Sequence, residues 1–168
     1  MQRRSLLKLG FISAAVLAVT GGAIALLKPG LQNGKLSDAS RDVFASVGRA
    51  VLAGTLPRES GASQIAVGRL LDRIDALTAS LAPHAQQELS QLLGLLATAL
   101  GRLAVAGLNT GWRDASVVDV QAALQSMRFS GLELRQQAYS ALHDISSAAY
   151  FADPSTWTVL GYPGPISI

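Results

Sequence analysis

Apolar residues recur at intervals of three and four positions through most of the chain, which is the spacing of one face of an α-helix. This pattern predicts five helices, which span Ser37 to Leu56, 63 to 81, Pro83 to about Leu103, Ser116 to about Met127, and about Gly131 to Phe151. No stretch of five residues alternates convincingly between apolar and polar side chains, as a half-exposed strand would. We therefore predict an all-α fold, a bundle of about five helices.

Local signals mark the ends of these helices. Pro57 closes the first helix, and Pro83 is suited to the first turn of the third because a proline there sacrifices no hydrogen bond. Ser116, followed three residues later by Asp119, resembles a capping box. Glycine inside a helix lowers stability relative to alanine, so we expect close helix crossings at Gly68, Gly94 and Gly101.

The N-terminal segment has the pattern of an export signal. Residues 2–8 read Gln-Arg-Arg-Ser-Leu-Leu-Lys, and residues 9–27 are uncharged and mostly apolar. A basic start followed by an apolar stretch is typical of signal peptides. The residues that resemble the twin-arginine consensus are Arg3, Arg4, Leu6, Leu7 and Lys8. Ala23 and Ala25 flank Ile24 as a small-x-small cleavage site.

An uncleaved anchor is the alternative to a cleaved signal. Residues 9–27 are just long enough to span a bilayer as a helix. Residues 28–36 hold a proline, two glycines and an asparagine, which is linker composition. We therefore expect a signal helix or anchor over 1–27, a linker over 28–36, a helical domain over 37–152 and an irregular aromatic and proline-rich tail over 153–168.

The charge of the chain is concentrated in the predicted signal. The net charge is +3, and Arg3, Arg4 and Lys8 supply three of the fourteen basic residues, so eleven basic residues and eleven acids remain. No basic patch with interleaved aromatics is present, and we expect no nucleic-acid partner. The chain has no cysteine, which excludes disulfides and thiolate chemistry.

Side chains suited to catalysis are few. The two histidines, His84 and His143, are far apart in sequence, and packing or solvation explains each of them more simply than catalysis does. Asp72 and Asp75 lie at helical spacing from Arg69 and Arg73, which indicates solvated ion pairs within one helix. No phosphate-binding or dinucleotide-binding glycine motif occurs. We expect no catalytic, cofactor-binding or metal-binding residue in this chain, and hence no enzyme activity of its own.

The aromatic residues gather near the C-terminus, where five of the nine lie in the last thirty positions. Aromatic side chains supply large buried area and are enriched among the anchors of protein interfaces. Either the tail packs on the end of the bundle or it contacts a partner, and the two roles are compatible. The residues expected to serve one role or the other are Tyr150, Phe151, Trp157, Tyr162 and Pro163.

The C-terminal pattern is similar to that of a known family. Ala149-Tyr150-Phe151-Ala152-Asp153-Pro154, then Trp157, then Gly161-Tyr162-Pro163-Gly164-Pro165, in a chain with a twin-arginine leader, resembles small exported proteins related to the gluconate 2-dehydrogenase third (gamma) subunit. The resemblance implies a partner, an FAD-dependent oxidoreductase of the glucose-methanol-choline family. It implies that the small subunit supplies the export signal and the catalytic subunit holds the FAD.

These observations together predict a non-catalytic small subunit. It would act as export escort and maturation partner of a periplasmic FAD-dependent dehydrogenase, with the twin-arginine translocase reading its leader. The expected location is the periplasm, with anchoring in the inner membrane as the alternative to release. The alternative function is a stand-alone periplasmic or membrane-anchored helical protein, with a structural or interaction role and no redox partner.

Overall fold

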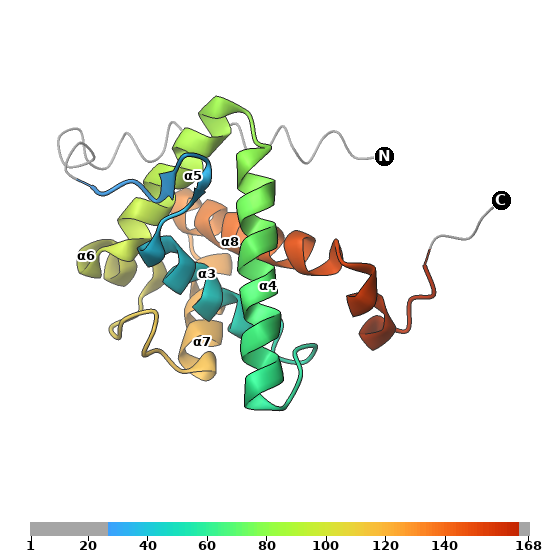
Figure 1. Ribbon diagram of the computed structural model, residues 1–168. Coiled ribbons are helices and arrows are strands. Elements are labelled where there is room, and N and C mark those ends of the chain that lie inside the picture. The colour runs from blue at the N-terminus through green and yellow to red at the C-terminus, as the bar shows by residue number, and fades with distance from the viewer. Residues whose placement is uncertain (1–26, 165–168) are drawn as a thin grey trace.

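The computed structural model describes residues 27–164, which form a mostly helical body (Figure 1). The long helices are α3 (Asp38–Val51), α4 (Ser60–Ala79), α5 (Pro83–Ala97), α7 (Val117–Arg128) and α8 (Glu133–Phe151). Three short elements accompany them: α6 (Ala99–Gly101), the π-helical turn η3 (Arg102–Ala106) and the 3-10 helix η4 (Pro154–Leu160). The predicted mostly helical fold is confirmed, and the expected signal helix lies outside the described residues.

Helix α3 is the centre of the core. It packs against α4, α5, α7 and α8, and Figure 1 shows it between them. Val43, Phe44 and Val47 on α3 are fully buried, and burial of a side chain of this size stabilises a fold by about 1.5–3 kcal/mol. The Ser37 side chain caps the start of the helix by accepting a hydrogen bond from the Ser40 amide.

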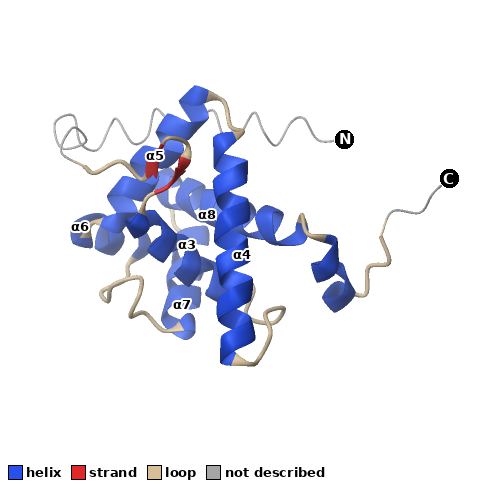
Figure 2. Cartoon of the chain, viewed as in Figure 1, coloured by secondary structure: helices blue, strands red, loops and turns tan. Residues whose placement is uncertain are grey.

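Residues 28–36, which were expected to be a linker, include a β-hairpin instead. Strands β1 (Leu31–Gln32) and β2 (Lys35–Leu36) pair antiparallel (Figure 2). The turn between them is Asn33-Gly34, and both residues have positive φ, as the tightest hairpin turns require. Leu31 and Leu36 are buried against the helices. The folded body therefore begins before residue 37.

Hydrogen bonds fix this hairpin to two helices. The Gly30 amide donates to the carbonyl of Ser90 on α5 at 3.1 Å. The Leu36 amide donates to Asp75 on α4 at 2.8 Å, and Thr78, one turn further along α4, donates its hydroxyl to the Gly34 carbonyl at 2.7 Å. The hairpin is short, but its backbone is hydrogen-bonded to α5 on one side and to α4 on the other.

The third predicted helix ends earlier than its pattern suggests. Helix α5 stops at Ala97, and the chain resumes in α6 and η3 at an angle of 92°. Thr98 has an extended ψ of 152°, and its hydroxyl oxygen accepts a hydrogen bond from the Gly101 amide at 3.0 Å, starting the new turn. As a result Leu100 and Leu103, which continue the apolar spacing of the predicted third helix, are 82% and 49% exposed.

Two of the three glycines singled out in the sequence lie at close approaches, although neither is a crossing of two long helices. A Cβ on Gly94 would lie 2.6 Å from the Lys28 carbonyl oxygen, and one on Gly101 would collide with the Leu95 carbonyl at the corner between α5 and α6. Nothing approaches Gly68, so the prediction was wrong there. The close crossing of α3 and α4 uses Gly48 instead, where a Cβ would lie 2.6 Å from a methyl group of Leu70.

Within residues 27–164, no individual helix combines the length and apolar composition needed to cross a membrane. Helix α5 together with α6 and η3 meets the criterion of length and composition, but only as a pair with the sharp bend at Thr98.

Candidate functional site

The C-terminal tail extends from the bundle at the end of α8 (Figure 1). Its 3-10 helix η4 packs chiefly on α8, and it contains residues that were expected to be irregular. An ion pair between Arg73 on α4 and Asp153 joins the start of the tail to the body. The tail therefore rests on the last turn of one helix, and its far end projects beyond the bundle.

Tyr150 belongs to the core. Only 4% of it is exposed, and its hydroxyl donates to the Thr55 carbonyl, in the loop between α3 and α4, at 3.2 Å. The ring of Phe151 meets it edge to face, with 5.2 Å between the ring centroids. Of the five aromatic and proline residues expected to pack or bind, Tyr150 thus serves packing, and it fastens the end of α8 to the α3–α4 loop.

The first residues of the tail cap α8. A helix leaves its last four carbonyls without donors from within the helix. The Thr156 hydroxyl lies 2.7 Å from the Asp153 carbonyl oxygen and 3.2 Å from the Tyr150 carbonyl oxygen. Trp157 donates its indole N–H to the Phe151 carbonyl at 2.7 Å. The Trp157 side chain therefore satisfies a backbone carbonyl that the end of α8 leaves open, while the Tyr150 carbonyl also accepts the Asp153 amide.

Asp153 organises the turn into η4. Its carboxylate accepts a hydrogen bond from the Ser155 amide at 2.9 Å. Hydrogen bonding from Ser155, and then the positive charges of Arg73 and Arg69, hold the pKa of the Asp153 carboxyl below its ordinary value of 3.8. Partial burial opposes the shift without reversing it. The ionised carboxylate is therefore part of the folded tail.

The outer part of the tail presents an aromatic tip, formed by Trp157, Tyr162 and Pro163. The rings of Trp157 and Tyr162 pack with centroids 5.3 Å apart, and Tyr162 is 48% exposed. The chain turns back through Gly161, which has a φ of 66°, and the Tyr162 amide donates to the Trp157 carbonyl at 3.1 Å. The tip is exposed, and its backbone is hydrogen-bonded in place.

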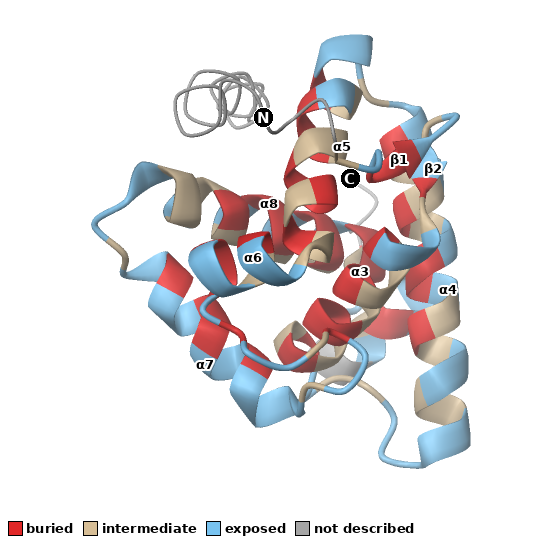
Figure 3. Cartoon of the chain, turned by 90° about the vertical axis from the view of Figure 1, so that its left-hand side faces the viewer, coloured by how far each residue is buried: buried red, intermediate tan, exposed pale blue. Residues whose placement is uncertain are grey.

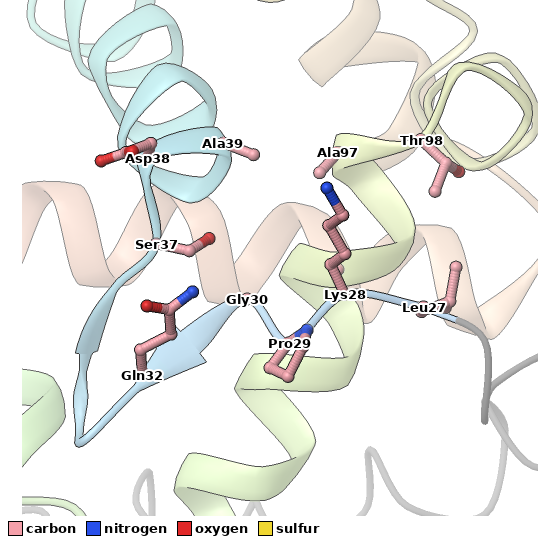
Figure 4. A pocket seen from close by; sticks show the side chains of 11 residues that line it. Leu27, Lys28, Pro29, Gly30, Gln32, Ser37, Asp38, Ala39, Ala97 and Thr98 are labelled. Carbon is pink, nitrogen blue, oxygen red and sulfur yellow. The ribbon is translucent and has the colours of Figure 1, made fainter.

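A separate cleft lies beside the first described residues of the chain. It has a volume of about 510 Å³ and is formed by the residues before β1, the start of α3 and the end of α5 (Figure 4). Lys28, Asp38 and Thr98 supply polar groups around Pro29 and Ala97. The helical periodicity does not reveal this cleft, because it depends on the docked hairpin and on the break of α5. Asn33-Gly34 is the sequence signal that would have predicted the hairpin.

Neither histidine belongs to the tail. His84 is exposed, and His143 stacks on Tyr139 and lies 3.0 Å from the Asp144 carboxylate. No group of three or more potential metal ligands occurs in the part of the chain that the structure describes. A second cleft of about 510 Å³, between α3, α7 and α8, includes Tyr139 and His143 in its lining.

The predicted ion pairs within α4 are replaced by pairs between elements. Arg41 on α3 donates to Asp75 at 2.6 Å and to Asp72 at 3.2 Å, while Arg73 pairs with Asp153. Asp75 also accepts the Leu36 amide, so this carboxylate joins α3, α4 and β2. The spacing along one helix could not show that the partners of these charges lie elsewhere.

The predicted export residues, Arg3 to Lys8 with Ala23 and Ala25, lie outside the described residues. No family model matches the chain, and no curated protein or solved structure is significantly similar to it. The resemblance to the gluconate 2-dehydrogenase gamma subunit therefore stays a prediction that rests on the residues quoted for it.

Proposed function

We propose that this protein is a non-catalytic small subunit that escorts a periplasmic FAD-dependent dehydrogenase through twin-arginine export and supports its maturation. Three observations support the proposal. The leader resembles a signal that folded proteins use, the tail resembles that of a known escort subunit, and the aromatic residues of that tail form an exposed tip. The FAD belongs to the partner, a glucose-methanol-choline family subunit.

The aromatic tip is the observation that carries the proposal. Tyr162 exposes about half of its surface, while Trp157 is held by its bond to Phe151. Aromatic residues are enriched among interface hot spots, and a group that is already ordered loses less entropy when it binds. An aromatic pair displayed on a capped helix end is thus suited to anchor a partner subunit.

The first test is a pull-down of the C-terminally tagged full chain from periplasm. We expect a yellow, flavin-containing partner to co-purify with the wild type. With Arg3→Lys/Arg4→Lys, both proteins should stay in the cytoplasm because the translocase no longer reads the leader. Wild-type protein that emerges alone and colourless would overturn the escort role and favour a stand-alone structural protein.

A second test addresses the tip itself. Tyr162→Ala in the wild-type background should weaken capture of the flavoprotein by roughly thirtyfold, the effect of a hot-spot residue of about 2 kcal/mol. Ile65→Ala is the control, because Ile65 is an apolar side chain that is 60% exposed near the start of α4, outside the tail. Equal capture by both variants would show that the tip is not the contact.

The alternative function is a stand-alone periplasmic or membrane-anchored helical protein. One observation favours it: the folded body begins directly after the apolar N-terminal stretch, with no free linker between them. Such a body would stay close to the membrane if the stretch were retained. The pull-down separates the two functions, because only the escort brings a flavoprotein with it.

A further inference from the structure

Four of the large exposed hydrophobic side chains belong to neighbouring elements. Leu100 and Leu103 lie on α6 and η3, and Phe129 and Leu132 lie in the turn between α7 and α8, with exposures from 49% to 82%. Element η3 packs against both α7 and α8. The contact is fixed by Arg135 at the start of α8, which donates to the Val105 carbonyl at 2.8 Å. We call these four residues the apolar face.

Figure 3 looks at the molecule from this end. Helix α6 and the turn between α7 and α8 lie on the same side of the view, and both have exposed surface, whereas α4 lies at the opposite edge. Soluble monomeric proteins rarely gather large apolar side chains on their surface without a binding role. The apolar face is therefore a candidate binding surface.

The chain enters the folded body at the same end. Leu27, the first described residue, lines a cleft together with Thr98, the residue at which α6 starts (Figure 4). The chain before it is the uncharged stretch of residues 9–27. Gly30 is already hydrogen-bonded to α5, so residues 28 and 29 alone separate Leu27 from the fixed body, a reach of about 10 Å.

The charges around the apolar face are mostly positive. Residues 99–106 and 126–135 contain Arg102, Arg128 and Arg135 but a single acid, Glu133. Arg102 and Arg135 donate to backbone carbonyls, and within residues 27–164 neither forms an ion pair with a carboxylate. The Arg128 guanidinium lies 5.3 Å from the centre of the Phe129 ring. Apolar side chains bordered by arginine are typical of surfaces that bind anionic membranes.

We propose that the apolar face lies on a bilayer containing anionic lipid, while residues 9–27 remain as an uncleaved membrane anchor. The short path from Leu27 to Gly30 keeps the body against the membrane, and the apolar face is the exposed surface that meets it. Lys28 and the three arginines then lie at the level of the headgroups. This proposal goes beyond the escort function and does not depend on a flavoprotein.

The absence of cysteine allows a direct test on the full chain. Single cysteines at exposed positions, Leu100→Cys and Phe129→Cys, are labelled with an environment-sensitive fluorophore, and the protein is reconstituted into vesicles of phosphatidylethanolamine and phosphatidylglycerol. Ile65→Cys on α4 is the matched control, because Ile65 is 60% exposed but lies on the helix at the opposite edge. Lipids with brominated chains serve as the quencher.

We expect emission from positions 100 and 129 to shift to the blue and to be quenched by brominated lipid, because an apolar face of this kind enters roughly 5–10 Å into the interface. Emission from position 65 should not change. Labels at 100 and 129 that behave like the label at 65 would overturn the proposal, even if the leader alone holds the protein on the vesicles. Failure to capture a flavoprotein would leave this result untouched, so the two proposals fail separately.

Discussion

The indole N–H of Trp112 donates a hydrogen bond of 2.7 Å to the backbone carbonyl of Leu96 inside the core. Leu96 lies in the last turn of α5, where helix carbonyls lack donors of their own. Trp112→Phe keeps an aromatic ring but removes the donor. We expect the free energy of unfolding to fall by about 1–3 kcal/mol, the cost of a buried carbonyl left unpaired, as measured by urea denaturation.

Trp157→Phe is the matched control for this substitution. Its indole bond to Phe151 lies at the tail and is only partly buried, so water can replace the lost donor. The unfolding of the body should change by less than about 0.5 kcal/mol. Equal losses in the two variants would contradict the special role of the Trp112 bond at the helix break.

Two glycines on helices should respond in opposite directions to alanine. At Gly94 the new methyl group would lie 2.6 Å from the Lys28 carbonyl oxygen, which is backbone and cannot move aside cheaply. We expect Gly94→Ala to destabilise the fold by about 1–3 kcal/mol. At Gly68 no atom lies within 4 Å, so Gly68→Ala should stabilise the fold by roughly 0.5–1 kcal/mol.

Thermal and urea denaturation of the two glycine variants provide the measurement. A stabilising Gly94→Ala would mean that the segment before β1 does not press on α5 as the structure shows. In that case the cleft beside Lys28 would also have a different shape.

Asp75 should matter more than its neighbour Asp72, although both accept hydrogen bonds from Arg41. The Asp75 side chain is 15% exposed and also accepts the Leu36 amide, whereas the Asp72 side chain is 75% exposed. Asp75→Ala leaves a partly buried donor unpaired and should cost about 1–3 kcal/mol. Asp72→Ala should cost less than about 0.5 kcal/mol, as exposed ion pairs usually do. Comparable losses in chemical denaturation would refute this ranking.

The docking of the tail should depend on acid pH through Asp153. The pKa of this carboxyl lies below 3.8 in the folded protein because Ser155 donates hydrogen bonds to it and Arg73 and Arg69 lie nearby. A depressed pKa means that the ionised form favours the folded tail. The stabilisation is complete above the unfolded pKa and is lost as the pH falls through the folded pKa.

We therefore expect the tail to be insensitive to pH between about 5 and 8 and to loosen below about pH 4. The Ser155 amide resonance, followed by NMR during acid titration, should shift with a midpoint below that of a free aspartate. Asp153→Asn should abolish this transition. A midpoint at or above 3.8 in the wild type would contradict the hydrogen-bonded arrangement.

The sequence predicted the long helices because their apolar spacing and caps are local properties. Ser116 does accept the Asp119 amide at 3.1 Å and starts α7, which is half of the predicted capping box. The Asp119 carboxylate accepts the Ser116 hydroxyl at 2.7 Å in place of the Ser116 amide. The break at Thr98 escaped prediction because leucines continue at helical spacing through Leu103. The turn of the chain depends on Thr98 and on the distant donor Trp112, and periodicity does not reveal such contacts.

The sequence predicted which residues belong to the candidate site but not how they are arranged in space. The clustering of aromatics pointed to the tail, yet the pattern could not separate Tyr150, which is buried, from Tyr162, which is exposed. That difference arises because Tyr150 belongs to the last turn of α8 and reaches Thr55, whereas Tyr162 follows the turn at Gly161. Burial here depends on tertiary contacts that join residues far apart in the chain.

The capping of α8 by the tail makes the aromatic tip a reporter of folding. The Trp157 indole can donate its hydrogen bond to the Phe151 carbonyl only when α8 has formed. That helix in turn needs the packing of Leu142 and Ile145 in the core. A protein that binds the tip therefore distinguishes folded from unfolded molecules of this chain without contacting the core. This chain is expected to cross the membrane already folded. The aromatic tip would then both bind the partner and signal that the chain has folded.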